Sequence, residues 1–170
     1  AVDSAVMVLD AAKGVEPQTR KLFAVCRQRG LPVLTFVNKL DLPSRDPFDL
    51  LDEIEKVLGM EAVPLNVPMG TGSDFRGVFD RRASRALWFE PFAGRQIPTP
   101  LDVADIEDPE LCRRLGAEQH AHFVEAVELL GALSEFDVEA FLQGRQTPVF
   151  FGSALNNFGV ETFLEEFAKL

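Results

Sequence analysis

Three polar side chains follow an apolar run near the start of the chain. Val33 to Val37 has the length and composition of a buried strand, and Asn38, Lys39 and Asp41 come directly after it. The carboxylate of Asp41 offers two acceptor oxygens side by side, which matches the ring N–H and exocyclic amine of guanine and nothing in adenine. The stem of Lys39 can lie along a flat base, and the Asn38 amide can donate to it. Because ligands bind at the carboxyl ends of strands in open α/β sheets, this stretch predicts a guanine site.

A second apolar run ends in small residues. Thr147 to Phe151 is followed by Gly152, Ser153, Ala154 and Leu155, and small residues at a strand end let a flat ligand approach the backbone closely. A strand often ends in Asn or Asp only to begin a turn, so the first run by itself also fits an ordinary strand end. Two such strand ends together favour a base-binding pocket.

The elements that must position these residues are those of a parallel α/β sheet. Ala5 to Asp10 is a continuous apolar run, typical of a strand that is buried on both faces. Residues 22–26 are apolar at helical spacing up to Gly30, and Val33 to Val37 follows, which completes a βαβ unit. Further helices are predicted after Asp46-Pro47, ending at Gly59, and over residues 160–167.

The middle of the chain has a different character. Residues 62–68 form one strand interrupted by prolines, hence an edge or irregular strand, and residues 77–80 and 86–89 form a hairpin. The arginines between its strands, Arg81, Arg82 and Arg85, are predicted to lie in a solvated turn, with a binding patch as the alternative. Residues 102–142 contain eleven acidic residues against two arginines and are predicted to be helical. The predicted buried stripe of this segment is Phe123, Val127, Leu130 and Leu133, with a break at Ser134 to Asp137.

Composition excludes several classes of function. The net charge of −10 argues against a surface that grips nucleic acid. No apolar run approaches the roughly 20 residues of a membrane span, so no membrane contact and a cytoplasmic location are expected. His120 and His122 lie on different faces of a helix, and Cys26 and Cys112 lie in different helices, so no metal site is expected. The loop Gly70 to Ser73 is no phosphate cradle, because neither Gly-Lys-Ser/Thr nor a helix follows it.

The chain resembles the GTP-binding domain of the elongation factor G group of translational GTPases over nearly its whole length. Within that group it is most similar to the class II peptide chain release factors, which recycle codon-reading release factors; the short segments 134–137 and 156–160 favour them over elongation factor G. The stretches that carry the resemblance are Ala1 to Glu16, Asn38 to Asp41, Phe75 to Val78 and Thr147 to Leu155.

The resemblance also shows what this sequence lacks. It lacks the family's Gly-Lys-Ser/Thr loop, switch threonine and Asp-x-x-Gly switch segment, all of which precede the position of Ala1 in the family. The fold implied is a P-loop GTPase-type doubly wound sheet lacking its first three strands. Residues 1–66 and 144–170 would form the C-terminal half of the GTP-binding domain, and residues 67–143 an inserted α+β subdomain. Removal of three strands would leave the first strand here with an unpaired edge, which favours self-association.

By resemblance, Asn38, Lys39 and Asp41 recognise guanine and Ser153, Ala154 and Leu155 complete the pocket. No residue is assigned to catalysis or to a metal. The intact protein would be a GTPase that uses GTP or GDP with Mg²⁺ and releases codon-reading release factors from the ribosome. This chain alone would be inactive, with no nucleotide bound. The acidic insert would contact the ribosomal stalk protein. The alternatives are a protein-interaction module acting through that insert, a translocation GTPase like elongation factor G, and a free-standing degenerate GTPase.

Overall fold

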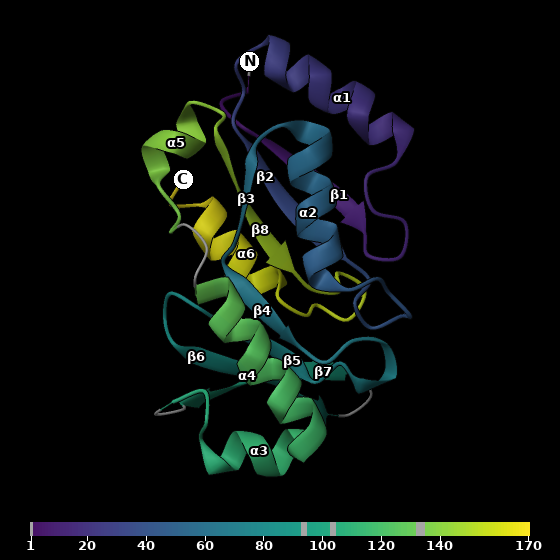
Figure 1. Cartoon of the computed structure of the whole chain (residues 1–170), viewed down its shortest axis with the longest axis vertical. Helices are drawn as coiled ribbons and strands as arrows, with labels where there is room; N and C mark the ends of the chain where they lie inside the picture. The colour runs from purple at the N-terminus through teal and green to yellow at the C-terminus, as the bar shows by residue number, and fades with distance from the viewer. Residues whose placement is uncertain (1, 93–94, 103–104, 132–134) are drawn as a thin grey trace.

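The computed structural model describes residues 2–92, 95–102, 105–131 and 135–170, without the side chains of residues 90–102 and 131. Its elements alternate between strands and helices at both ends of the chain, with a run of strands and then of helices between them (Figure 1). In chain order they are β1 Ala5–Asp10, α1 Pro17–Gln28, β2 Val33–Asn38, α2 Pro47–Leu58, β3 Glu61–Pro64, β4 Asn66–Met69, a 3₁₀ turn Gly72–Asp74, β5 Gly77–Asp80, β6 Arg85–Phe92, β7 Arg95–Asp102, α3 Pro109–Leu115, α4 Ala117–Gly131, α5 Val138–Leu142, β8 Gln146–Phe151 and α6 Val160–Phe167.

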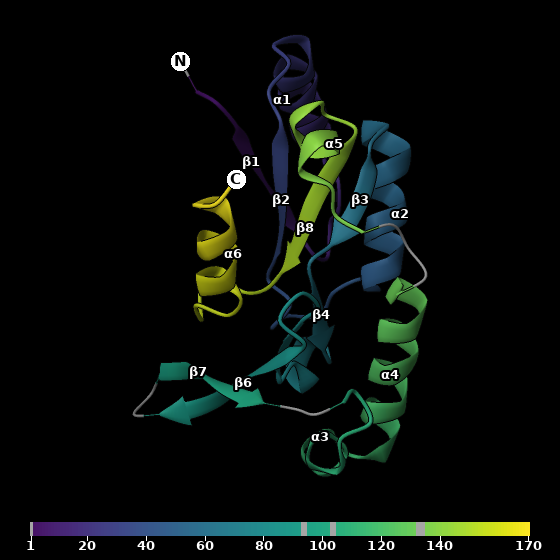
Figure 2. The ribbon, with the colours of Figure 1, turned by 90° about the vertical axis from the view of Figure 1, so that its left-hand side faces the viewer.

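Four strands form a parallel sheet in the order β1-β2-β8-β3, which confirms the predicted α/β architecture. Helices α1 and α2 cover one face and α6 lies on the other (Figure 2). Asp10 pairs with Asn38, and Val37 pairs with Phe151, so the neighbouring strands β1, β2 and β8 end at one edge of the sheet. Both motifs singled out by the sequence follow strands at this edge.

The first strand departs from its prediction. Met7 and Leu9 are buried against α1 and α2, but Val6 is 40% and Val8 is 57% exposed. These two valines pair with Leu34 and Phe36, whose side chains pack on the face of α6. β1 is therefore buried on one face only, and the prediction that both of its faces are buried is wrong. A strand at the end of a sheet is buried on a face only where another element covers that face.

A second, antiparallel sheet has the order β4-β5-β6-β7. The predicted hairpin is confirmed as β5 and β6. The expected single strand over residues 62–68 is wrong: β3 is the edge of the parallel sheet, as the prolines suggested, whereas β4 starts at Asn66 and belongs to the second sheet. Sequence reasoning also missed β7, whose two prolines mask its alternation.

The acidic segment is helical, as predicted, and packs on the second sheet. Phe123 and Leu130 of α4 are buried, and Val127 is partly buried, while Leu133 and Ser134 lie outside the described residues. The helix after the predicted break, α5, instead places Phe141 in the core of the parallel sheet. No helix in the described part of the chain is both long and apolar enough to cross a bilayer.

Arg81 is not solvated as expected for the hairpin turn. Its guanidinium donates to the carbonyl oxygens of Pro64 at 2.8 Å and Leu130 at 2.7 Å, and desolvation lowers its pKa. Arg82 instead forms an ion pair with Glu166 of α6. Both arginines therefore join the second sheet to other elements.

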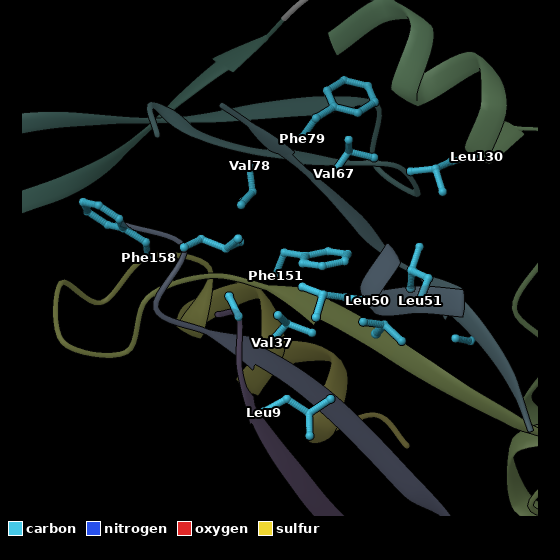
Figure 3. Close-up of a cluster of buried hydrophobic side chains, with 14 of the residues drawn as sticks. Leu9, Val37, Leu50, Leu51, Val67, Val78, Phe79, Leu130, Phe151 and Phe158 are labelled. Carbon is cyan, nitrogen blue, oxygen red and sulfur yellow. The ribbon is translucent and has the colours of Figure 1, made fainter. Parts of the chain in front are cut away.

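The two sheets share one hydrophobic core. Figure 3 shows Phe151 at the end of β8 between side chains of the parallel sheet, such as Val37, and side chains of the second sheet, such as Val67 and Val78. A buried polar contact also joins the two sheets. Buried Asn66 donates from Nδ2 to the carbonyl of Phe151 at 3.0 Å and accepts its N–H at 2.7 Å. The Asn66 amide thus replaces the backbone partner that β8 loses where the chain leaves the parallel sheet after β3.

Replacing Asn66 with alanine should therefore destabilise the chain by about 2–4 kcal/mol, because it leaves a buried N–H and a buried C=O of Phe151 without partners. Urea denaturation measures this change. The control is Gln28→Ala, which removes an exposed amide at the end of α1. Equal unfolding midpoints for the two variants would contradict the role assigned to Asn66.

Candidate functional site

The ends of β2 and β8 are joined by backbone hydrogen bonds. Gly152 donates to the carbonyl of Val37 at 3.0 Å, and Leu40 donates to the carbonyl of Gly152 at 3.1 Å. A Cβ on Gly152 would lie 2.2 Å from the Phe158 carbonyl oxygen and 2.9 Å from the ring of Phe36. Because such contacts do not occur, only glycine at this position lets the Phe158 backbone and the Phe36 ring lie so close to the end of β8.

The side chain of Asn38 connects the two predicted motifs. Its Oδ1 accepts the backbone N–H of Lys39 and that of Ala154, each at 2.8 Å. Two backbone donors fix the orientation of the amide, because only its oxygen can accept them. The Nδ2 group is then directed away from both backbone groups as a donor of two hydrogen bonds.

Lys39 is held in an unusual conformation. Its φ of 71° lies in the left-handed region, which costs energy for a residue with a side chain. Its Nζ contacts the Asp10 carboxylate at 2.9 Å, and the other Asp10 oxygen accepts the N–H of Ala12 at 2.9 Å. The hydrogen bond from Lys39, assisted by the Ala12 N–H, lowers the pKa of Asp10, and Asp10 raises the pKa of Lys39. The ammonium is thus anchored beside the strand ends.

The Asp10 pKa has a consequence for pH dependence. A depressed folded pKa means that the pair stabilises the fold above the ordinary Asp value of 3.8, and that this stabilisation is lost as the pH falls through the lower folded value. We expect an NMR titration of the Asp10 carboxyl to show a pKa below 3.8 that returns toward 3.8 in Lys39→Met. A wild-type value at or above 3.8 would show that the pair does not form in solution.

Asp41 is half-buried and has a side-chain partner that sequence reasoning missed. Nδ2 of Asn156 donates to Oδ2 of Asp41 at 2.7 Å. The only sequence signal was a pair of turn-forming residues, Asn156 and Asn157, directly after the Ser-Ala-Leu motif. The contact adds a second side-chain link between the loops after β2 and β8.

The loop after β8 is closed at its base. Ser153 and Phe158 exchange backbone hydrogen bonds, with N–O distances of 3.0 and 2.8 Å, and Asn157 has a φ of 61°. The ring of Phe158 is 2% exposed and stacks on Phe89 of β6, with ring centroids 3.8 Å apart and an interplanar angle of 9°. Phe75 lies on the same ring at 5.5 Å between centroids. The second sheet therefore anchors the loop that carries Ala154 and Asn156.

The structure brings most of the predicted base-binding residues to one edge of the sheet. Asn38 and Ala154 are in contact, and Lys39 and Asp41 belong to the same short turn. Two residues stand apart: Ser153 is buried and its Oγ has no hydrogen-bond partner among the described residues, whereas the side chain of Leu155 is 92% exposed. The N–H groups of Ser153 and Ala154 are both engaged within the protein, by Phe158 and Asn38.

The donors and acceptors at this edge suit a heterocyclic base. The Asp41 carboxylate can accept hydrogen bonds, and the Nδ2 group of Asn38 can donate them. For phosphates the residues fit less well. The Gly70–Ser73 segment, expected as a loop, contains a single 3₁₀ turn, and its Gly72 N–H is used by the Leu40 carbonyl at 2.7 Å. Among the described side chains no group of three or more His, Cys, Asp or Glu residues could hold a metal ion.

Comparison with known proteins agrees with this geometry. Residues 1–170 match the family of the elongation factor Tu GTP binding domain. Peptide chain release factor 3 of Gloeobacter violaceus is 51% identical over 170 residues, which cover 99% of this chain and 32% of that protein. Proteins of the same name from Symbiobacterium thermophilum and Synechocystis are each 50% identical over 171 residues, covering 100% and 99% of this chain and 32% and 31% of those proteins. The chain thus spans about a third of the length of these relatives.

Proposed function

Because the chain belongs to the elongation factor Tu GTP-binding domain family, we propose that it forms the guanine-recognition part of a GTP-binding domain. This part corresponds to the C-terminal half of the domain, without its first three strands, and residues 67–143 form a subdomain inserted between its strands. Apart from Asn66 at the start of β4, the antiparallel sheet lies within those residues, as do helices α3 and α4, and this supports the division.

One observation carries the proposal. The hydrogen bond from the Ala154 N–H to Asn38 Oδ1 joins two loops that are more than a hundred residues apart in sequence, at the carboxyl ends of adjacent parallel strands. Neighbouring parallel strand ends are where α/β sheets bind ligands. A turn that served only to reverse the chain would need no such contact between the motifs.

The geometry suggests how guanine would be read. The Asp41 carboxylate accepts the ring N–H and the exocyclic amine, Asn38 Nδ2 donates to the opposite edge of the base, and the stem of Lys39 lies along its face. Ser153 supports the loop from inside, and Ala154 and Leu155 border the base. A pocket built for two donors disfavours adenine, because the carboxylate would be desolvated without partners; comparable sites discriminate by about four to five powers of ten.

The intact protein would then be a GTPase of translation termination. We propose that it binds GTP or GDP with Mg²⁺, acts on the ribosome and promotes release of codon-reading release factors, in the cytoplasm. Similarity to peptide chain release factor 3 along the whole chain supports termination over translocation. The proposal gives no residue of this chain a role in hydrolysis. Mg²⁺ would be held by residues outside this chain and would neutralise phosphate charge.

Nucleotide titration tests the proposal directly. Two or three base contacts of about 1–3 kcal/mol each leave a dissociation constant in the millimolar range or weaker for the chain alone. The complete product of the gene should bind GDP and GTP tightly and ATP weakly, as measured by calorimetry. If this chain bound guanine nucleotides as tightly as the complete product, the base contacts would supply most of the affinity. If neither protein bound guanine nucleotides, the proposal would be refuted.

The acidic surface of the insert favours a second candidate function, as a protein-interaction module. Glu118, Glu125 and Glu128 are exposed on α4, whose last turn carries no basic residue. In this candidate the acidic surface contacts a basic patch on a partner protein, and the family resemblance implies the ribosomal stalk protein as that partner. Pull-down with the Glu125→Lys/Glu128→Lys variant tests it, and Glu161→Lys/Glu165→Lys on exposed positions of α6, outside the insert, is the control of equal charge change. Retention of binding in the first variant would contradict this function.

The exposed edge of β1 leads to an expectation for the isolated chain. Val6 and Val8 are exposed residues of β1, and within the described residues β1 pairs only with β2. Unpaired apolar edges associate, so we expect concentration-dependent dimers in sedimentation experiments. The Val8→Lys variant should reduce them, and Leu142→Lys on α5 is the matched control, because Leu142 is similarly exposed away from this edge. A strictly monomeric wild-type chain at high concentration would contradict the expectation.

A further inference from the structure

The amide of Asn156 makes a hydrogen bond that backbone closure of its loop does not require. Its Nδ2 lies 2.7 Å from Oδ2 of Asp41, whereas the loop is already closed by the paired backbone bonds of Ser153 and Phe158. The Asn157 N–H also contacts the Ala154 carbonyl at 3.3 Å within the same loop. Because the turn is fixed by its backbone, it presents the Asn156 side chain at a defined place.

The bond restricts the one torsion of Asp41 that matters for base recognition. The plane of an aspartate carboxylate rotates about a broad, roughly two-fold torsion, so its two oxygens do not hold one direction without a partner. A donor on Oδ2 fixes that plane. Each carboxylate oxygen has two acceptor positions, so Asn156 leaves one position on Oδ2 and both on Oδ1. The amide therefore orients the carboxylate and leaves an acceptor position free on each of its oxygens.

We propose that Asn156 is a positioning residue for base specificity, which holds the Asp41 carboxylate in the plane needed to accept two donors of guanine at once. This inference rests on the proposed function of the site. A freely rotating carboxylate can still turn to accept one ring N–H. It accepts the N–H and the exocyclic amine together only in one orientation, so loss of Asn156 weakens the two-point contact more than the one-point contact.

Two nucleotides separate these contacts. GDP offers the ring N–H and the amine, whereas IDP, the inosine nucleotide, offers the ring N–H alone. In the complete product of the gene, Asn156→Ala should weaken GDP binding about tenfold and IDP binding less than about threefold, as for the loss of a hydrogen bond to a charged group. The ratio of the two affinities therefore falls. Asn156→Asp should weaken GDP binding further, because two carboxylates would then face each other.

The control is Asn157→Gly, which removes the neighbouring amide and keeps a residue that adopts a φ of 61° without strain. Its GDP-to-IDP ratio should equal that of the wild type. Unchanged GDP affinity in Asn156→Ala, or an equal loss for both nucleotides, would overturn the inference and leave the proposed function intact. If the wild-type protein bound neither nucleotide, the proposed function itself would fail, and the inference with it.

Discussion

Replacing Asp41 with asparagine is expected to exchange guanine for xanthine as the preferred base. Xanthine keeps the ring N–H and carries a carbonyl oxygen where guanine has its amine. An asparagine at position 41 would accept the N–H and donate to this carbonyl, whereas its NH₂ would oppose the amine of guanine. The loss of GDP affinity is expected to reach about four powers of ten, because the mismatch leaves buried polar groups unpaired.

Competition binding of GDP and XDP to the complete product of the gene measures this exchange. The control is Asp49→Asn, which removes the same charge from an exposed position in the first turn of α2. It should leave both affinities unchanged within about twofold, since a single exposed charge contributes little. Retained preference for GDP in Asp41→Asn would show that Asp41 does not read the base, and would remove the main support for guanine recognition.

Truncation of Phe158 to alanine is expected to produce the largest loss of stability. The ring is 2% exposed and packs against Phe75, which precedes β5, and Phe89 of β6, so its removal leaves a cavity that costs about 3–5 kcal/mol. For a chain of this size that loss lowers the melting temperature by roughly 6–20 °C. Scanning calorimetry and urea denaturation of the chain measure it. Phe167→Ala is the control, because that ring is 41% exposed.

The same substitution should also weaken GDP binding at the candidate site. Phe158 closes the loop through its backbone bonds to Ser153, and the packed ring holds that backbone in place. Phe158→Leu keeps most of the apolar volume and should remain folded, with a smaller loss of GDP affinity than Phe158→Ala. If Phe158→Ala lowered stability with no change in GDP affinity of the folded protein, the loop would be independent of the second sheet.

Sequence alone determined the location of the candidate site. The residue types and strand-end positions of Asn38, Lys39 and Asp41 depend on local patterns, because an apolar run of strand length followed by polar residues needs little tertiary information to interpret. The helix after Asp46 is equally local: the Asp46 carboxylate caps the Phe48 N–H at 2.8 Å, and Gly59 ends the helix in a left-handed conformation. Turn and capping signals of this kind lie within a few residues of their effects.

Tertiary structure decided which polar groups are free at that site. Ser153 and Ala154 are predicted to complete the pocket, but their N–H groups are bonded to the Phe158 carbonyl and to Asn38 Oδ1, and the Asp41 carboxylate accepts from Asn156. The Asn38–Ala154 and Asp41–Asn156 contacts join residues about 115 positions apart, and no spacing in the sequence encodes them. The Asn66 amide that replaces a backbone partner of Phe151 was hidden for the same reason.

Strand β1 shows most clearly the difference between what the sequence pattern predicts and what tertiary structure decides. The composition of β1 is that of a strand buried on both faces, and a sequence pattern reports the surroundings for which a strand is suited. In this chain β1 lies at the end of the parallel sheet, so Val6 and Val8 are exposed although their residue types favour burial. Burial depends on which elements are present to cover a face, and that is decided by tertiary packing and not by the strand itself.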